Sequence, residues 1–290
     1  MFFSKKSIEK KGRFVVVVGT SPLAVFLVYV LQENGFDVTV LKSVKNKEIW
    51  QNYTLHNAFQ NQSIDVNICE NLNKKPECCF IASSFDEYKS DLFFLSDVFL
   101  KDVPVVNFSS FYNHKIIEQM ENVNEIRAHF KGWLVKSRKE LFLLNRVSEI
   151  IVCENKNKET FLKELLTDKK IDIKNEKDSD KLFFQELAAS FLGNLCLLAY
   201  KSDISLIVAD NEKRKRVDLA ISETAKLLKK EKHQIDEQKV LSDIYAFPDG
   251  YTSEFDSKQG IDALSKFVDG IDYFETPNLY ELFATACKKY

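Results

Sequence analysis

A stripe of polar residues runs along an otherwise apolar helix in the second half of the chain. Glu186, Ser190 and Asn194 are spaced four residues apart within the predicted helix Lys181–Tyr200, so they fall along one side of it. A carboxyl group can give or take a proton, and a hydroxyl and an amide can bind the polar groups of a small molecule. A buried core helix does not need such a stripe, whereas a helix beside a cleft does. A solvent-facing helix edge is the alternative explanation.

A second group of residues has the pattern of a phosphate-binding turn. The β-branched run Phe14–Val18 ends at Gly19, and an apolar helical stretch, Leu23–Leu31, follows at once and ends near Gly35. In such a unit the N–H groups of the helix N-terminus point at the ligand above the turn, which is typically a pyrophosphate.

The glycine fingerprint of this turn is only partly present. The G-x-G-x-x-G pattern falls on Gly19, Ser21 and Ala24. Ser21 places a Cβ where the backbone should approach phosphate, although its hydroxyl could donate to a phosphate oxygen. A βαβ unit that binds nothing at this turn is the alternative. The expected cofactor-binding residues of the turn are Gly19, Thr20, Ser21, Pro22 and Leu23.

Polar residues also follow the later predicted strands. An NAD site carries an acidic residue after the second strand, and this chain has Lys42 and Ser43 there, which favours NADP. The carboxyl ends of the fourth and fifth strands carry serine and asparagine. A lysine-rich surface loop and ordinary turn-forming residues are the alternatives. The further expected cofactor contacts are Lys42, Ser43, Ser83, Ser84, Asn107 and Ser109.

The first half of the chain must position the turn. Strand and helix signals alternate there, which indicates a mostly parallel sheet with helices on both faces. The predicted strands are Phe14–Val18, Val38–Leu41, Ile64–Ile68, Cys78–Ala82 and Val103–Phe108. The predicted helices include Phe85–Lys101, Lys115–Met120 and Thr160–Leu166. We expect three short runs to add antiparallel strands to the same sheet, namely Trp133–Val135, Leu141–Leu144 and Glu149–Cys153.

The second half must position the polar stripe. Beyond the polar run Asn175–Asp180 the strand signals disappear, and the predicted helices are Lys181–Tyr200, Asn211–Lys230, Glu237–Tyr245, Ile261–Val268 and Asn278–Lys288. The fold class is therefore α/β, with an N-terminal Rossmann dinucleotide-binding domain over residues 1–176 and an all-α C-terminal domain over residues 177–290. A cleft between the two is the default place for a substrate.

Composition excludes several classes of function. The 290 residues carry a net charge of −2, which argues against a nucleic-acid partner. The six cysteines form no C-x-x-C pair, so reduced thiols are expected rather than a disulfide framework or a metal site. The N-terminus does not have the pattern of a signal peptide, and Leu187–Tyr200 is too short and too polar to span a membrane. We expect a cytoplasmic protein.

Three stretches of the chain resemble the ketopantoate reductases (2-dehydropantoate 2-reductases). Leu182–Asn194 resembles the family's interdomain helix, and Glu223–His233 is similar to a later family helix. Thr252–Asp256 together with Thr276–Leu282 resembles the family's S-S-M-x-x-D helix start and its C-terminal T-P-x-x-x-x-L-Y-x-L run. Domain order and lengths agree over nearly the whole chain. The chain is identified as a divergent member, with the type known as PanG as a candidate.

This resemblance implies NADPH-dependent reduction of ketopantoate to pantoate, a step toward pantothenate and coenzyme A. The family's general acid is a lysine at the position of Glu186, so Glu186 is the expected replacement acid. Asn194 matches a family asparagine and Ser190 replaces another, and both are expected to bind substrate. Ser253 matches the serine that binds the substrate hydroxyl, although a plain helix cap explains it equally. The expected catalytic residues are Glu186, Asn194 and Ser253.

Two other functions stay open. One is a catalytically inactive Rossmann-type binding or regulatory module, and the other is a reductase of a different 2-oxo acid. The resemblance makes a homodimer plausible, with a small 2-oxo acid as the substrate.

Overall fold

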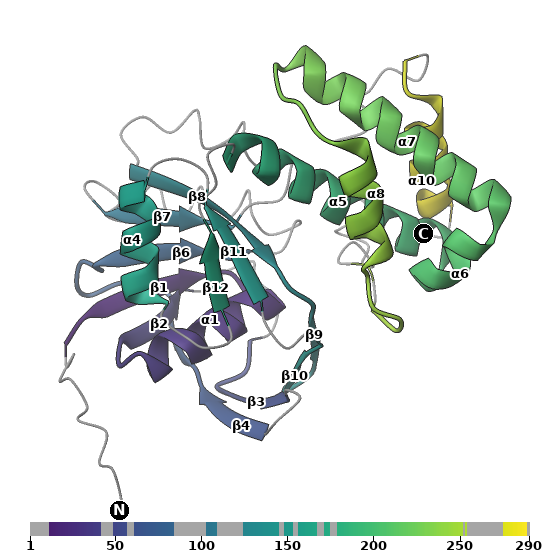
Figure 1. Cartoon of the computed structure of the whole chain (residues 1–290). Helices are drawn as coiled ribbons and strands as arrows, with labels where there is room; N and C mark the ends of the chain where they lie inside the picture. Colours follow the sequence, from purple (N-terminus) through teal and green to yellow (C-terminus); the bar gives the residue numbers. More distant parts are fainter. Residues whose placement is uncertain are drawn as a thin grey trace, which may run out of the picture.

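The computed structural model consists of a sheet-containing half and a helical half joined by one long helix (Figure 1). It describes residues 12–41, 49–56, 61–83, 103–108, 124–144, 148–152, 156–166, 171–174, 179–251, 253 and 275–288. The predicted helices Phe85–Lys101, Lys115–Met120 and Ile261–Val268 lie outside these ranges, as does the expected domain boundary at residues 176 and 177.

An eight-stranded sheet forms the centre of the N-terminal half. Its strand order is β12-β11-β8-β7-β6-β1-β2-β5, and the six strands from β5 to β8 run parallel. Counted along the chain, these six have the order 3-2-1-4-5-6 of dinucleotide-binding sheets, with the switch point between β1 and β6. The strands are β1 (Phe14–Val18), β2 (Asp37–Leu41), β5 (Asn67–Cys69), β6 (Cys78–Ile81), β7 (Pro104–Asn107), β8 (Asn124–Lys131), β11 (Ser148–Val152) and β12 (Ile171–Lys174).

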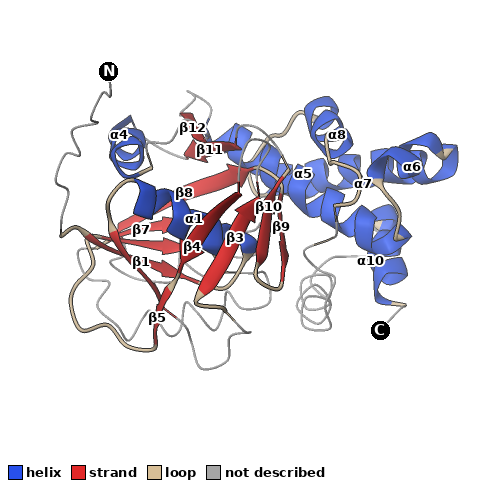
Figure 2. Cartoon of the chain, turned by 90° about the horizontal axis from the view of Figure 1, so that it is seen from below, coloured by secondary structure: helices blue, strands red, loops and turns tan. Residues whose placement is uncertain are grey.

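Helix α1 (Pro22–Glu33) is buried from Ala24 to Leu31, which is unusual for a helix on the face of a sheet. A second sheet of order β4-β3-β10-β9 contacts its other side (Figure 2). Two layers of strands therefore enclose α1, and its apolar residues need no polar face. The strands of this sheet are β3 (Asn52–His56), β4 (Asn61–Asp65), β9 (Leu134–Ser137) and β10 (Glu140–Leu143).

The second sheet corrects two sequence expectations. The runs at Trp133–Val135 and Leu141–Leu144 do not extend the main sheet, because β10 pairs with β3 and β9 instead. The single strand expected at Ile64–Ile68 is divided between β4 and β5, which belong to different sheets. Only the run at Glu149–Cys153 joins the main sheet, as β11 antiparallel to β8.

The helical half packs around the middle and end of α5 (Ser179–Tyr200), which contacts every other described helix of this half. The segment Lys181–Tyr200 is long and apolar enough to cross a membrane, but 89% of its apolar window is buried inside the protein, which is typical of a core helix. The other helices are α6 (Ile204–Ala209), α7 (Asn211–Lys230), α8 (Glu237–Tyr245) and α10 (Pro277–Cys287), and α4 (Lys156–Leu165) belongs to the sheet half.

Helix α5 also joins the two halves, since it contacts β8 and β11 of the main sheet. Trp133 and Val135, from the sheet half, pack against the apolar core of the helical half. The two halves thus meet over the carboxyl ends of β1, β6 and β8, where this class of sheet binds its ligands.

Candidate functional site

A cavity of about 380 Å³ lies where the two halves meet. Its walls come from the turn after β1, the end of β6, strand β8, helix α5 and the end of α8. The cavity brings together predicted cofactor residues from one half and predicted substrate residues from the other. They are Ser21, Pro22, Leu23 and Ser83 on the sheet side, and Glu186, Ser190, Asn194 and Ser253 on the helical side.

The turn after β1 requires glycine at its first position. Gly19 has φ +113°, and a Cβ there would lie 2.6 Å from both the Ala82 carbonyl oxygen and the Ser83 Cα. Those atoms are backbone and cannot move aside, so the turn passes directly over the end of β6. Gly19 is therefore explained by chain packing as well as by ligand approach.

Ser21 is used differently from the sequence expectation. Its Oγ donates a hydrogen bond to the Ala82 carbonyl and accepts one from the Ala24 N–H at 3.1 Å, so it caps helix α1. The hydroxyl proton is directed at β6 rather than at a phosphate. Pro22 has no N–H, and the Ala24 N–H is bonded to Ser21. Leu23 therefore supplies the N–H of the first turn that the cap does not use. Lys136 of β9 donates to the Thr20 carbonyl and places a positive charge beside the turn.

The other predicted cofactor residues do not all reach the cavity. Ser83 lines it. Asn107 is fully buried, donates through Nδ2 to Glu125 Oε1 at 2.7 Å and is not part of the cavity wall. Lys42, Ser43, Ser84 and Ser109 lie outside the described residues.

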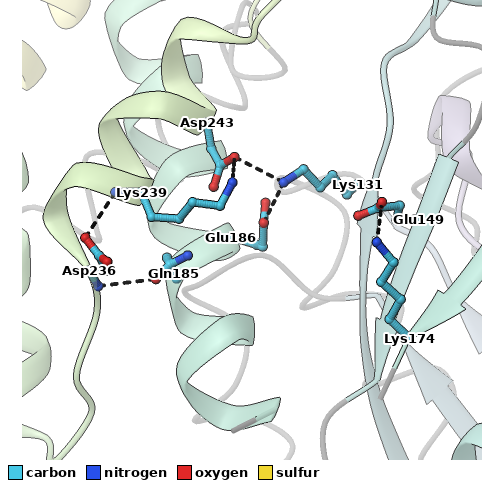
Figure 3. A network of polar contacts seen from close by, with 8 residues as sticks. All are labelled: Lys131, Glu149, Lys174, Gln185, Glu186, Asp236, Lys239 and Asp243. Atoms are coloured by element: carbon cyan, nitrogen blue, oxygen red, sulfur yellow. Dashed lines mark hydrogen bonds and ion pairs between the residues drawn. The ribbon is translucent and has the colours of Figure 1, made fainter. Parts of the chain in front are cut away.

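Glu186 is part of a cluster of charges that spans the two halves (Figure 3). Lys131 Nζ, at the end of β8, lies 2.7 Å from Glu186 Oε1 and 3.1 Å from Asp243 Oδ1 of α8. Lys239 Nζ, one turn earlier on α8, lies 2.8 Å from the same Asp243 oxygen. The cluster thus pairs two lysine side chains with two acidic ones, and three of the four, Lys131, Glu186 and Asp243, line the cavity.

Burial shapes the proton affinities of this cluster. It raises the pKa of Glu186, and the hydrogen bond and charge of Lys131 offset this only in part. Burial also lowers the pKa of Lys131, but its contacts with Glu186 and the charge of Asp243 outweigh this, so the pKa stands above its usual value. Lys131 is therefore an ammonium at neutral pH. Burial lowers the pKa of the nearby His129 to about 4, with the charge of Lys131 adding to the effect, so His129 is neutral.

The polar stripe of α5 faces the cavity along its whole length. Glu186, Ser190 and Asn194 all line it. The stripe therefore lies beside a cleft and does not form a solvent-facing edge of the helix. Asn194 is 2% exposed and donates through Nδ2 to the Ser190 carbonyl at 3.0 Å. This bond fixes the orientation of the amide group.

Three aromatic rings form a second, apolar part of the cavity wall. The Trp133 ring centroid lies 4.1 Å from that of Phe247 and 5.2 Å from that of Tyr251. Gly193 of α5 makes room for this group, because a Cβ there would lie 2.3 Å from Phe247 Cζ. We call Trp133, Phe247 and Tyr251 the aromatic wall.

Sequence reasoning did not identify Lys131, Asp243 or the aromatic wall. A signal for Lys131 is present in the alternation along β8, where Ile126 and Ala128 are buried and His129 and Lys131 fall on the other face. Asp243 carries no such signal, because its position on an amphipathic helix resembles an ordinary charged surface site.

Comparison with known proteins identifies solved structures of similar fold. No family model and no curated protein sequence matches the chain. Among solved structures, a D-mandelate dehydrogenase with NADH and anilino(oxo)acetate has a TM-score of 0.75 at 13% identity, covering 95% of this chain and 97% of that one. A dimeric ketopantoate reductase from Staphylococcus aureus has a TM-score of 0.70 at 16% identity, covering 94% and 97%. A 2-dehydropantoate 2-reductase from Geobacter metallireducens has a TM-score of 0.71 at 13% identity, covering 96% and 100%.

These similarities bear out the expected fold. The chain has a ketopantoate reductase-like fold, in which a Rossmann-type sheet is followed by a helical half.

Proposed function

We propose that the protein is a nicotinamide-dependent reductase of a 2-oxo acid, with NADPH and ketopantoate as the first pair to test. One observation carries this proposal: a single cavity joins the turn at the sheet switch point to a buried lysine–carboxylate cluster. The solved structures of similar fold support it, since they are reductases and dehydrogenases of small 2-oxo and 2-hydroxy acids by their names.

The residues of the turn fit a dinucleotide. Leu23 offers a helix N-terminal amide, Lys136 adds positive charge beside Thr20, and Gly19 keeps the backbone close to β6. Ser83 contributes a hydroxyl from the end of β6. When bound, the reduced nicotinamide supplies a hydride. We assign Lys42 and Ser43 to the 2′-phosphate of NADPH, because these two residues, and no acidic one, stand directly after β2.

The helical side of the cavity fits the substrate. Asn194 and Ser190 are assigned to hydrogen bonds with a carboxylate or a hydroxyl group of the substrate, and Ser253, which also lines the cavity, to a third. Glu186 and Lys131 lie where a proton is needed for the alcohol product. The proposal includes a cytoplasmic location and a homodimer, and the similar ketopantoate reductase from Staphylococcus aureus is dimeric by its name.

The aromatic wall favours a second substrate class. Trp133, Phe247 and Tyr251 present apolar surface to the cavity, which suits a 2-oxo acid with a ring or branched side chain better than a polar one. The D-mandelate dehydrogenase of similar fold was solved with anilino(oxo)acetate, which carries such a ring.

The test is the loss of NADPH absorbance when the purified protein meets ketopantoate or phenylglyoxylate. Turnover of order 1 per second or faster that needs both cofactor and acid supports the proposal, and the ratio of kcat/KM for the two acids identifies the class. Equal affinity for NADH and NADPH would remove the assignment of Lys42 and Ser43. NADPH binding without turnover of any 2-oxo acid would favour the binding-module alternative, and no binding at all would refute cofactor use.

A further inference from the structure

Lys131 has a donor that no other residue of the described ranges uses. An ammonium group carries three N–H bonds. The contacts with Glu186 Oε1 and Asp243 Oδ1 account for two of them, and no other described residue takes the third. The side chain is 31% exposed and lines the cavity, so the third N–H is open to a ligand there.

The sheet does not compete for this ammonium. Glu149 of β11 is the cross-strand neighbour of Lys131, but Glu149 Oε1 accepts from Lys174 Nζ at 2.6 Å (Figure 3). Lys131 is held instead by carboxylates of the helical half. Asp243 Oδ2 is buried and has no hydrogen-bond partner among the described residues, so the contacts of this carboxylate with Lys131 and Lys239 are made through Oδ1.

We propose that Lys131 is the catalytic residue that donates the proton to the carbonyl oxygen of the substrate, and that Glu186 and Asp243 are positioning residues that hold its ammonium group. The inference rests on the proposed reductase function. Hydride addition at the carbonyl carbon moves the π electron pair of the C=O bond to oxygen. A proton from Lys131 Nζ completes the hydroxyl group, and the neutral amine regains a proton from solvent.

The geometry favours Lys131 over Glu186 for this step. The Glu186 side chain is only 5% exposed, and its Oε1 already accepts from Lys131. Lys131 also lines the cavity, and its side chain is 31% exposed, so it keeps contact with solvent, from which it can be reprotonated. The acid of the reaction would then come from the sheet half of the protein, and its two holders from the helical half.

The pH dependence of kcat separates the two candidate acids. The groups that face Lys131 are Glu186 on α5, Asp243 and Lys239 on α8, His129 on β8 and Glu149 on β11. Because its pKa lies above the usual value, an ammonium acid keeps kcat constant through neutral pH and lowers it only in alkaline solution. In a Glu186→Gln variant the pKa of Lys131 falls, so this alkaline limb moves to lower pH. If Glu186 were the acid, wild-type kcat would instead decline as its carboxyl group ionised, below the alkaline range.

Substitutions of Lys131 separate a chemical role from a structural one. Lys131→Arg keeps a positive charge for Glu186 and Asp243 but cannot give up a proton, so the fold should persist while kcat falls about 100-fold or more. Lys131→Ala should show a similar loss, and added methylammonium should restore about tenfold or more of it. The control is Lys74→Met. Lys74 Nζ also pairs with one carboxylate, Asp37 Oδ2 at 2.9 Å, but at the start of β2 and away from the cavity. The kcat of the Lys74→Met variant should differ from that of wild type by less than about twofold.

Direct binding gives a readout that does not depend on turnover. NADPH affinity, measured by fluorescence titration, should be the same in wild type and Lys131→Arg. Oxamate, an unreactive analogue of a 2-oxo acid, should bind about tenfold more weakly to Lys131→Ala in the presence of NADPH, since a charged hydrogen bond is lost. Full kcat in Lys131→Arg, or no rescue of Lys131→Ala by methylammonium, would overturn the assignment while leaving the reductase intact. A wild-type protein that reduces no 2-oxo acid would overturn the proposed function and the inference with it.

Discussion

Replacement of Gly193 by alanine tests whether the aromatic wall is built on helix α5. Glycine in a helix interior costs roughly 1 kcal/mol relative to alanine, so the substitution would stabilise the protein if the new methyl group met no obstacle. In this structure its Cβ would lie 2.3 Å from Phe247 Cζ and 2.5 Å from Cε2. Ordinary carbon contacts are about 3.5–4.0 Å, so the ring must move by roughly 1.5 Å.

The neighbours of Phe247 resist this movement. The ring is 5% exposed and packs against Trp133 and Tyr251. Overpacking of this kind costs about 1–3 kcal/mol, which exceeds the helical gain of about 1 kcal/mol. We expect Gly193→Ala to lower the free energy of unfolding by about 1 kcal/mol and to raise the KM for a 2-oxo acid severalfold, because the displaced ring enters the cavity.

The assay is urea unfolding of four proteins: wild type, Gly193→Ala, Phe247→Leu and the double variant. In the Phe247→Leu background the ring is absent, so alanine should recover its helical gain and the two substitutions should couple by about 1–2 kcal/mol. Additive effects, with alanine stabilising both backgrounds equally, would refute the contact between the ring and the helix.

Other parts of the structure give three further predictions. Gly19→Ala should destabilise the protein by about 2 kcal/mol or more in urea unfolding, whereas Gly250→Ala, also at positive φ but with no atom within 4 Å of the added Cβ, should cost less; equal losses would show that the approach to β6 is unimportant. Glu223, 6% exposed, accepts from the N–H groups of Asn278 and Leu279 at the start of α10, so Glu223→Ala should cost about 2–3 kcal/mol and Glu223→Gln less, and an unchanged unfolding midpoint would contradict this cap. The pKa of His129 is about 4 when folded and 6.5 when unfolded, so the unfolded chain binds the extra proton and stability should fall as pH drops from 6.5 to 4. We expect a loss of about 1–2 kcal/mol, since the ring is partly exposed, and His129→Gln should abolish it.

The parts of the fold set by local patterns were predictable from sequence. The bounds of β1, α7 and α8 agree with expectation, because each has a clear period and clear ends: Asp210 and Asp236 cap the two helices through backbone N–H groups. The second sheet was not predictable. Its parallel pair joins Leu55 to Leu141, and no local pattern specifies a partner so distant in the chain.

The same distinction explains which part of the site was found. The spacing of Glu186, Ser190 and Asn194 is a property of one helix, so sequence alone could align them. Lys131 lies 55 residues before Glu186 and 112 before Asp243, and only the docking of α5 and α8 against β8 brings the three together. A buried glutamate alone would be costly to ionise. The ammonium groups of Lys131 and Lys239 offset part of that cost, although burial still raises the pKa of Glu186. Glu186 therefore cannot be interpreted as an isolated acid: its burial and its charge both depend on a lysine contributed by the opposite half of the protein.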